Sequence, residues 1–440
     1  MSDDTIRSLG PSAPVVPTPR SASARAWNAV RVGLFLADRQ IRASIGTSLL
    51  IIVVMMLTFL NLLVVGGLMV GIVQGLRSER QQYYSGDVLL SNYTQKDSIQ
   101  NSYDVMSYLR ALPSTASFSA RYVTSGELEG NYAGKLLLRD NTDAIYTTIA
   151  GIDPITEDAT TNLSSLLVEG EYLQPDDYDQ VVIGTSLLGR YKTLTAIPGS
   201  TPIPNVGIGS KVRIVINGVE HEMTVKGIVG SKVQEINLRV FMVGSQLRSM
   251  LGRTDNGVNE IALRLVPGAD PRAVQEQLRQ AGIGSDAKVE LALESEPVFF
   301  QDFATTFNKL GSLLGGIGLV VAFIVIFILV FINTIIRRRS IGILQAIGIQ
   351  STGIEIGYVV QSVLYAIIGA AIGMLVLFLF LEPLFTAHPI DFPFSNGDLA
   401  VAFPEAILKA LVLVVAIILA SFIPARMIMR QEIVDAILGR

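Results

Sequence analysis

The segment that decides the fold runs from Leu310 to Ile336 and reads LGSLLGGIGLVVAFIVIFILVFINTII. None of these residues is charged, and most are Leu, Ile, Val or Phe. A helix of about 20 apolar residues crosses the roughly 30 Å hydrocarbon core of a bilayer. The segment is therefore predicted to span a membrane.

Three other stretches have the same character, namely Ile45–Ile72, Ile354–Leu381 and Ala406–Ile428. Half of the 440 residues are hydrophobic, 16% are charged, and the mean hydropathy is +0.47. This composition excludes an ordinary soluble protein of this length. A polar segment long enough for a domain lies between the first two spans. The predicted fold class is a membrane α-helical protein with four transmembrane helices and an α+β extracytoplasmic domain inserted between helices 1 and 2.

Basic residues in the short flanking segments predict the orientation, because they favour the cytoplasmic side. The loop 382–405 between spans three and four holds no Lys or Arg. The segments before span one, after span two and after span four hold Arg20, Arg25, Arg31, Arg39, Arg42, Arg337, Arg338, Arg339, Arg426, Arg430 and Arg440. Both termini are therefore expected in the cytoplasm, and the large domain outside.

The large domain has an acidic excess, which argues against nucleic acid as a partner. The chain has no cysteine, which excludes a disulfide-rich secreted protein and is compatible with a bacterial envelope protein. The first apolar run starts late and is too long for a signal peptide. We expect a multi-pass protein of the bacterial plasma (inner) membrane.

The chain is expected to divide into ten parts. In order, these are a disordered cytoplasmic tail (1–24), an amphipathic interfacial helix (25–43), transmembrane helix 1 with a stalk (45–76), the extracytoplasmic domain (77–298), a stalk with transmembrane helix 2 (299–336), a cytoplasmic coupling helix (337–353), transmembrane helix 3 (354–381), a short extracytoplasmic loop (382–405), transmembrane helix 4 (406–429) and a cytoplasmic tail (430–440). The interfacial helix is predicted from apolar Trp27, Val30, Leu34 and Ile41 at helical spacing. The stalk is predicted from Phe299, Phe303 and Phe307, which repeat every four residues into span two.

The extracytoplasmic domain is predicted to contain a β-hairpin at Lys211–Lys226, because alternating strands flank Asn217-Gly218, a pair suited to a tight turn. Two βαβ units are expected at the ends of the segment. One comprises Asp87–Ser91, Ser98–Leu112 and Ser117–Val123, and the other comprises Asn259–Leu265, Arg272–Ala281 and Lys288–Leu293. The two units are expected to pack together near the stalk, leaving the middle as a separate β-rich subdomain.

The sequence lacks the features of a catalytic or cofactor site. It has no phosphate-binding G-x-x-x-x-G-K-[ST] loop, so the chain is not itself an ATPase. Its only histidines are His221 and His388, without cysteine, which makes a zinc site improbable. We predict a non-catalytic subunit with no metal and no cofactor of its own.

Residues 337–350 read RRRSIGILQAIGIQ, which resembles the E/R-R-x-x-E-I-G-I-L-x-A-x-G segment of FtsX/MacB/LolC-type ABC transporter permeases. The C-terminal Pro424–Arg426 and Glu432–Ile437 resemble the ending of that family. In the outer segment, short stretches such as Gly151–Pro154 and Glu169–Tyr172 resemble its MacB-like periplasmic core domain. The resemblance covers residues 25–437 and departs at Ser340, which lies one residue from where an acidic residue is common.

In that family the loop between spans two and three is a short coupling helix that docks into the ATPase. The corresponding residues here are Arg337, Arg338, Arg339, Ile341, Gly342, Leu344, Gln345, Ala346, Ile347 and Gly348. Ile341, Leu344 and Ile347 offer an apolar stripe, which suits a docking role. The alternative for the three arginines is plain positive-inside anchoring.

Three glycine pairs have the G-x-x-x-G spacing that lets membrane helices pack closely. They are Gly67/Gly71, Gly311/Gly315 and Gly369/Gly373. Packing within the chain is favoured over a dimer seam, because Gly is common in membrane helices.

The resemblance implies a permease subunit of a mechanotransmission-type ABC transporter, in which a separate ATPase binds ATP and Mg. Such a subunit moves its outer domain to export or extract a lipid, lipoprotein, peptide or drug. The expected partners are the ATPase, a second copy or a paralogous permease, membrane lipid, and an extracytoplasmic adaptor or hydrolase. The alternative is an FtsX-like signalling protein that activates a cell-wall hydrolase.

Overall fold

The computed structural model describes residues 31, 33–35, 37–39, 41–42, 45–132, 143–191, 201–336, 342–343, 346, 351–392 and 395–429. The chain divides into two compact units. The helical unit comprises Met1–Val64, Leu313–Phe380 and Ala402–Arg440, and the domain unit comprises Val65–Ser312 and Leu381–Val401.

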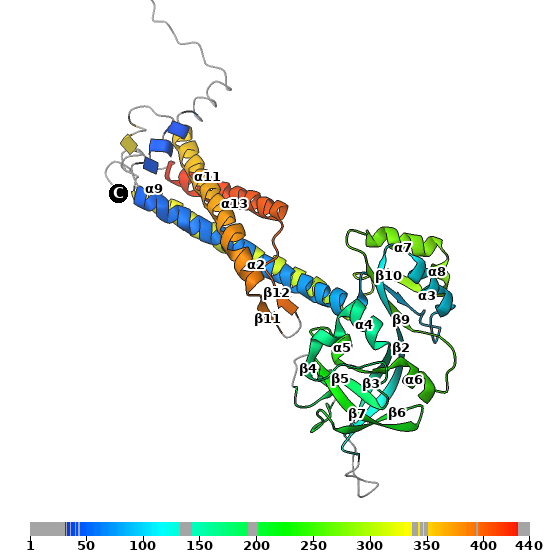
Figure 1. The fold of residues 1–440 in the computed structure, drawn as a ribbon. Coiled ribbons are helices and arrows are strands. Elements are labelled where there is room, and N and C mark those ends of the chain that lie inside the picture. The colour runs from blue at the N-terminus through cyan, green and yellow to red at the C-terminus, as the bar shows by residue number, and fades with distance from the viewer. Residues whose placement is uncertain are drawn as a thin grey trace, which may run out of the picture. The chain divides into compact units, whose positions relative to one another are not determined.

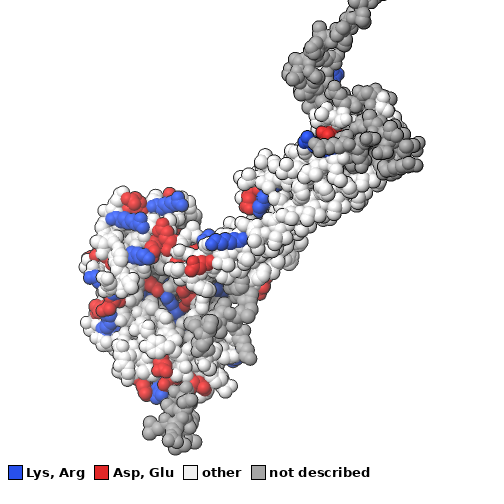
Figure 2. All heavy atoms as spheres, turned by 180° about the vertical axis from the view of Figure 1, so that it is seen from behind, with Lys and Arg blue, Asp and Glu red and all other residues white. Residues whose placement is uncertain are grey.

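In the described part of the chain, four long helices are apolar enough to cross a membrane, which confirms the four predicted spans. They are α2 (Ile45–Arg80), α9 (Val298–Ile336), α11 (Ser351–Val376), which the π-helix η5 (Leu377–Leu381) continues, and α13 (Phe403–Met429). On the face seen in Figure 2 the helical unit is nearly free of charged side chains, whereas acidic and basic residues intermingle over the domain. Uncharged surface is what a lipid-facing helix requires, because a charge in hydrocarbon is costly.

Helices α2 and α9 are longer than a bilayer needs. At 1.5 Å per residue, the 36 residues of α2 and the 39 of α9 measure roughly 54 Å and 58 Å. The aromatic repeat from Phe299 to Phe307 therefore belongs to the same continuous helix as the apolar segment that follows it, as its spacing predicted.

The described residues between 31 and 42 are helical and lie within the segment 25–43, where an amphipathic interfacial helix was predicted. Gly33 and Ala37 are buried there, while Leu34 and Phe35 are exposed. Trp27 and Val30 of the predicted stripe lie outside the described residues.

The domain unit is built on a mixed sheet, which has ten strands in the described residues. The strands are β1 (Val88–Ser91), β2 (Thr115–Gly130), β3 (Asp143–Ile152), β4 (Leu167–Gly170), β5 (Gln180–Gly184), β6 (Lys211–Ile216), β7 (Val219–Val229), β8 (Arg239–Val243), β9 (Glu260–Leu265) and β10 (Lys288–Leu291). Their order is β10-β1-β9-β2-β3-β8-β5-β7-β4, and β6 pairs with both β2 and β7. Figure 1 draws the strands of the domain unit as arrows.

The two predicted βαβ units are present and interleave. Strand β1 of the first unit lies between β9 and β10 of the second, and β9 lies between β1 and β2. Helices α3 (Ser102–Ala111) and α7 (Pro271–Gln280) follow β1 and β9 in the chain. Their buried residues share one hydrophobic core with these strands. Asp270 caps α7 by accepting a hydrogen bond from the Arg272 amide, and Pro271 occupies the first turn. Helix α3 starts four residues later than predicted, because Asn101 has a φ of +47° and cannot belong to a helix.

The β-rich middle and the βαβ units share one strand, β2. Strand β2 is 16 residues long: Thr115–Arg121 pairs with β9, and Tyr122–Gly130 pairs with β3. The predicted strand ended at Val123, and the residues that follow include Gly and Glu, which disfavour strands. Tertiary pairing overrides that preference, since buried Glu129 forms an ion pair with Arg213 directly across on β6.

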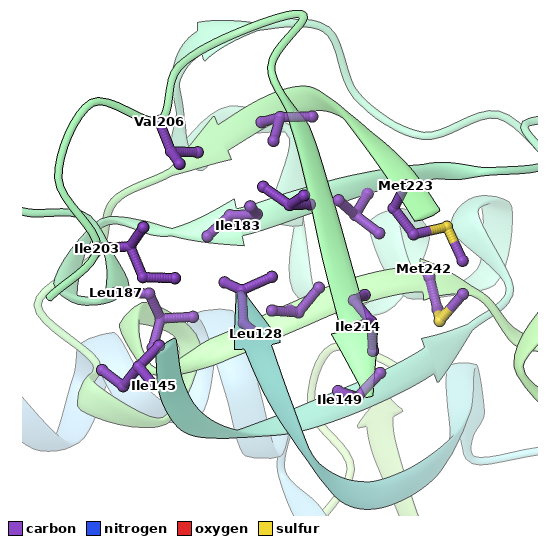
Figure 3. Close-up of a cluster of buried hydrophobic side chains, with 14 of the residues drawn as sticks. Leu128, Ile145, Ile149, Ile183, Leu187, Ile203, Val206, Ile214, Met223 and Met242 are labelled. Atoms are coloured by element: carbon purple, nitrogen blue, oxygen red, sulfur yellow. The ribbon is translucent and has the colours of Figure 1, made fainter. Parts of the chain in front are cut away.

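Strands β2, β3, β8, β5, β7 and β6 pair in a closed ring. The buried side chains inside it, such as Leu128, Ile149, Ile183 and Ile214, point toward one another (Figure 3). The predicted hairpin is confirmed as β6 and β7, and Asn217 and Gly218 have φ of +52° and +80°, as a type I′ turn requires.

Short elements complete the domain unit. They are α4 (Pro154–Thr161), α5 (Gln234–Asn237), α6 (Gly244–Met250), α8 (Ile283–Asp286), α12 (Glu382–Ala387), the π-helix η1 (Gln81–Ser85), the 3-10 helices η3 (Leu163–Leu166) and η4 (Thr185–Leu187), and a two-stranded hairpin of β11 (Ile390–Phe392) and β12 (Ser395–Gly397). The hairpin belongs to the loop between α11 and α13.

Candidate coupling site

The predicted ATPase-docking segment lies between the end of α9 at Ile336 and the start of α11 at Ser351. The structure describes Gly342 and Ala346 there, both helical, with Gly342 buried and Ala346 exposed. The other predicted residues lie outside the described part of the chain, namely Arg337, Arg338, Arg339, Ile341, Leu344, Gln345, Ile347 and Gly348.

One residue of this segment was missed by the sequence prediction. Ile343 is helical and half exposed, at 50%. Residues three apart on a helix share a face, so Ile343 and Ala346 lie on one apolar, solvent-accessible face. The spacing of Ile343 to Ala346 was a usable signal, but the prediction started its stripe at Ile341.

In the helical unit, α11 approaches α2 closely through glycines. A side chain at Gly369 would put its Cβ 2.7 Å from the Met55 Cβ and 3.0 Å from the Met56 amide nitrogen. At Gly373 it would meet the Phe59 ring at 2.9 Å. This pair therefore serves helix packing, in the manner that small residues allow in membranes.

A buried polar contact joins the same two helices. The Tyr365 hydroxyl of α11 lies 2.6 Å from the Ser48 hydroxyl of α2 and accepts a hydrogen bond of 2.7 Å from the Gln361 amide. All three residues are at least 96% buried. Hydrogen bonds of this kind fix the register of two membrane helices, because the groups have no water to bind instead.

The Gly67/Gly71 pair packs within the chain, and the atoms nearest to it belong to a loop. A Cβ at Gly67 would lie 2.9 Å from Leu399, and one at Gly71 would collide with the Asp398 carbonyl. Both partners belong to the loop between α11 and α13. The third pair is less confined: a Cβ at Gly311 would be 3.1 Å from Met69 of α2, and one at Gly315 would be at ordinary contact distance, 3.6 Å, from Leu62.

In the domain unit, two arginines one turn apart fasten the end of α2. Arg77 donates hydrogen bonds of 2.8 and 3.4 Å to the carboxylate of Glu296, which lies two residues before α9 begins. Arg80 pairs with Glu235 of α5 at 2.8 Å. Arg80 also donates to Ser295 Oγ and to the carbonyls of Ala292 and Ser295. These bonds tie the end of α2 to the start of α9 and to the domain.

Tyr84 of η1, just beyond α2, lies in a buried network of charged residues. The guanidinium carbons of Arg121 and Arg239 each lie 4.9 Å from the centre of its ring. Its hydroxyl donates a 3.0 Å hydrogen bond to Glu260. Arg121 pairs with Glu157 at 2.6 Å, and Arg239 pairs with Glu260 at 2.8 Å. Cations over an aromatic face are favourable, and more so when desolvated.

The carboxylates of this network are ionised because of their arginines. Burial would by itself raise the pKa of Glu260, but Arg239, Arg121 and the Tyr84 hydroxyl outweigh it and lower the pKa to about 2. Burial opposes ionisation of Glu157 as well, and Arg121, Ser119 and Thr161 together lower its pKa. The network joins η1 to β2, β8, β9 and α4, so the residues that follow α2 are fixed to the centre of the sheet.

No cluster of three or more potential metal ligands occurs among the described residues. His221 lies on β7 and His388 follows α12, in separate elements. Chemically, the arrangement consists of ion pairs and helix contacts.

Two family models match the chain in succession. Residues 63–281 match the MacB-like periplasmic core domain, and residues 312–433 match the FtsX-like permease C-terminal domain. No curated protein matches the sequence significantly.

Solved structures are similar to part of the chain. The periplasmic region of MacB from Actinobacillus actinomycetemcomitans is 15% identical, with a TM-score of 0.32, over 47% of this chain and 90% of that one. The extracellular domain of the ABC-type transporter YknZ from Gram-positive bacteria is 13% identical, with a TM-score of 0.31, over 46% of this chain and 97% of that one.

Proposed function

Because the chain belongs to the FtsX/MacB-type family of ABC-transporter permeases, we propose that it couples ATP hydrolysis by a separate ATPase to movement of its outer domain. The movement would export or extract a lipid, lipoprotein, peptide or drug that already lies outside the membrane. ATP and Mg would be bound by the ATPase. Two copies of the permease, or one with a paralogue, would assemble with two ATPase subunits.

The observation that carries the proposal is the fastening of α2 at its domain end. Arg80 binds Glu235 and Ser295, Arg77 binds Glu296 beside the start of α9, and Tyr84 is held among Arg121 and Arg239. Breaking a buried ion pair costs several kcal/mol. A displacement of α2 or α9 along its axis would therefore move the sheet of the domain as well, because these contacts would have to break for the helix to move alone.

The character of the helical unit supports movement in preference to passage of substrate through a pore. Among its described residues, no Asp, Glu, Lys or Arg is buried. The buried polar residues in that part are Ser48, Gln361, Ser362 and Ser421. Ion and substrate pathways inside membranes are usually marked by ionisable residues.

Ala346→Asp tests the docking segment. Ala346 is exposed on the helical face that it shares with Ile343, so an aspartate would place a charge in an apolar contact with the ATPase. We expect at least a tenfold loss of affinity for the partner ATPase, measured by co-purification and by stimulation of ATP hydrolysis. Tyr146→Asp is the matched control, because Tyr146 is 76% exposed on β3 of the domain.

Unchanged association in Ala346→Asp would contradict the assignment of this segment. Absence of any nucleotide-dependent association of the unmodified chain would contradict the transporter function as a whole. If association holds but the only consequence of ATP hydrolysis is activation of a cell-wall hydrolase, the protein is an FtsX-like signalling protein.

A further inference from the structure

Three glycines one helical turn apart, Gly67, Gly71 and Gly75, form a groove on α2. The groove is filled by the backbone of the loop between α11 and α13. A Cβ at Gly71 would collide with the Asp398 carbonyl oxygen, and one at Gly75 would collide with the Asn396 carbonyl oxygen. Backbone cannot move aside as a flexible side chain can, so only glycine permits this approach.

Direct hydrogen bonds hold the loop in the groove. The Ala400 amide donates to the Gly67 carbonyl at 3.3 Å, and the Ser395 hydroxyl donates to the Ile72 carbonyl at 2.6 Å. Ser395 is fully buried, and Leu399 is 4% exposed. We call residues 390–392 and 395–401 the strap. Ser395, Gly397, Leu399 and Val401 of the strap are buried, whereas Ile390, Asp391 and Asp398 are exposed.

Lys232 of the domain also binds the strap. Lys232 donates to the Asp391 carboxylate at 2.7 Å and to the Asn396 side-chain oxygen. The Asn396 side chain in turn donates to Glu79 of α2 at 2.6 Å. Lys232 lies between β7 and α5, three residues before Glu235, which binds Arg80. One loop of the domain therefore binds both the strap and α2.

The strap is covalently continuous with two membrane helices. It follows α12, which continues from α11, and it ends at Val401, two residues before α13 begins at Phe403. We propose that the strap is a second coupling element, with Lys232 as its positioning residue, through which α11 and α13 act on the outer domain. This inference rests on the proposed function, in which the helical unit drives the domain.

Thiol protection tests the seating of the strap, and the chain is suited to it because it contains no cysteine. Ser395→Cys introduces a single buried thiol of similar size. We expect slow reaction with an impermeant maleimide, and at least tenfold faster reaction when Gly71→Ala is added. Gly46→Ala is the matched control, since it makes the same change on α2 where an added Cβ meets nothing within 4 Å.

Lys232→Ala provides a second variant that leaves the glycine groove intact. It should also accelerate labelling of Ser395→Cys, whereas Lys211→Ala, which removes a lysine from an exposed ion pair on β6, should not. Equal labelling rates in Gly71→Ala and Gly46→Ala, or in Lys232→Ala and Lys211→Ala, would overturn the proposal.

The link to the domain is tested by the distance between two spin labels on exposed residues, Tyr146→Cys on β3 and Leu408→Cys on α13. The distances are measured with the ATPase bound, with and without nucleotide. We expect one narrow distance distribution in each condition, and we expect Lys232→Ala to broaden it. A distribution that Lys232→Ala leaves unchanged would refute the strap as a coupling element. A distribution that Lys232→Ala broadens but nucleotide never shifts would support the strap and contradict the proposed function instead.

Discussion

At the scale of single residues, the network around Tyr84 predicts a pH dependence of stability. The pKa of Glu260 is lowered from 4.5 to about 2 in the folded domain, so folding favours the ionised form. Its contribution is complete above pH 4.5 and is lost as the pH falls toward 2. The shift corresponds to about 3 kcal/mol at neutral pH, at 1.36 kcal/mol per unit.

Glu260→Gln should remove this contribution. We expect faster hydrogen exchange of the β9 amides at pH 7 in the full-length protein, and a weaker dependence of that exchange on pH between 4.5 and 3. Glu171→Gln is the control, because the Glu171 side chain is 81% exposed and its ion pair is weak. Its carboxylate comes no closer than 4.0 Å to the Lys226 ammonium nitrogen. Similar exchange in both variants would show that the Glu260 pair contributes nothing to stability.

This network could not be predicted from the sequence, for a physical reason. Arg121, Glu157, Arg239 and Glu260 are far apart in the chain and look like ordinary surface charges. Charged residues are almost never fully buried unless they are paired, and the pairing arises only when β2, α4, β8 and β9 meet. By contrast, the helix at Arg272–Ala281 was predicted, because its start depends on neighbours in sequence such as Pro271.

At the scale of elements, the contact of α11 with α2 makes a prediction about membrane helix packing. Gly369→Ala adds a Cβ at 2.7 Å from Met55 and 3.0 Å from the Met56 backbone, so the helices must separate. Overpacking of this kind typically costs about 1–3 kcal/mol. The variant should melt several degrees lower in detergent than the unmodified protein.

Gly316→Ala on α9 is the matched control, because nothing lies within 4 Å of an added Cβ there. Both changes raise helix propensity equally, so any difference in melting temperature reports packing alone. Equal melting of the two variants would mean that α2 and α11 do not approach each other as closely as described.

Elements were predictable where their signal is local. The hairpin at Asn217-Gly218 and the four spans were found from turn chemistry and from apolar length. Strand β2 was predicted too short because Gly126, Glu127 and Glu129 oppose a strand locally. The spacing of Gly67 and Gly71 was a real packing signal, but spacing alone does not reveal whether a helix or a loop fills the groove.

At the scale of the whole molecule, the order of four spans and one inserted domain followed from hydropathy, since a long apolar helix satisfies its own backbone hydrogen bonds inside a bilayer. Hydropathy did not predict that β2 is shared by the βαβ units and the β-rich middle of the domain. Sheet order depends on contacts between residues that are distant in sequence. Hydropathy also leaves open which side of the membrane each segment occupies. That choice rests on the positions of the basic residues.

The orientation is itself testable with single cysteines in this cysteine-free chain. Arginines flank the cytoplasmic ends expected for α2, α9 and α13, while residues 382–405 have none. Tyr146→Cys, exposed on the domain, should react with an impermeant maleimide in intact cells from which any outer barrier has been removed. Ala346→Cys, exposed between α9 and α11, should react only after the plasma membrane is permeabilised. Labelling of Ala346→Cys from outside would place the docking segment opposite to any cytoplasmic ATPase and would exclude the proposed coupling.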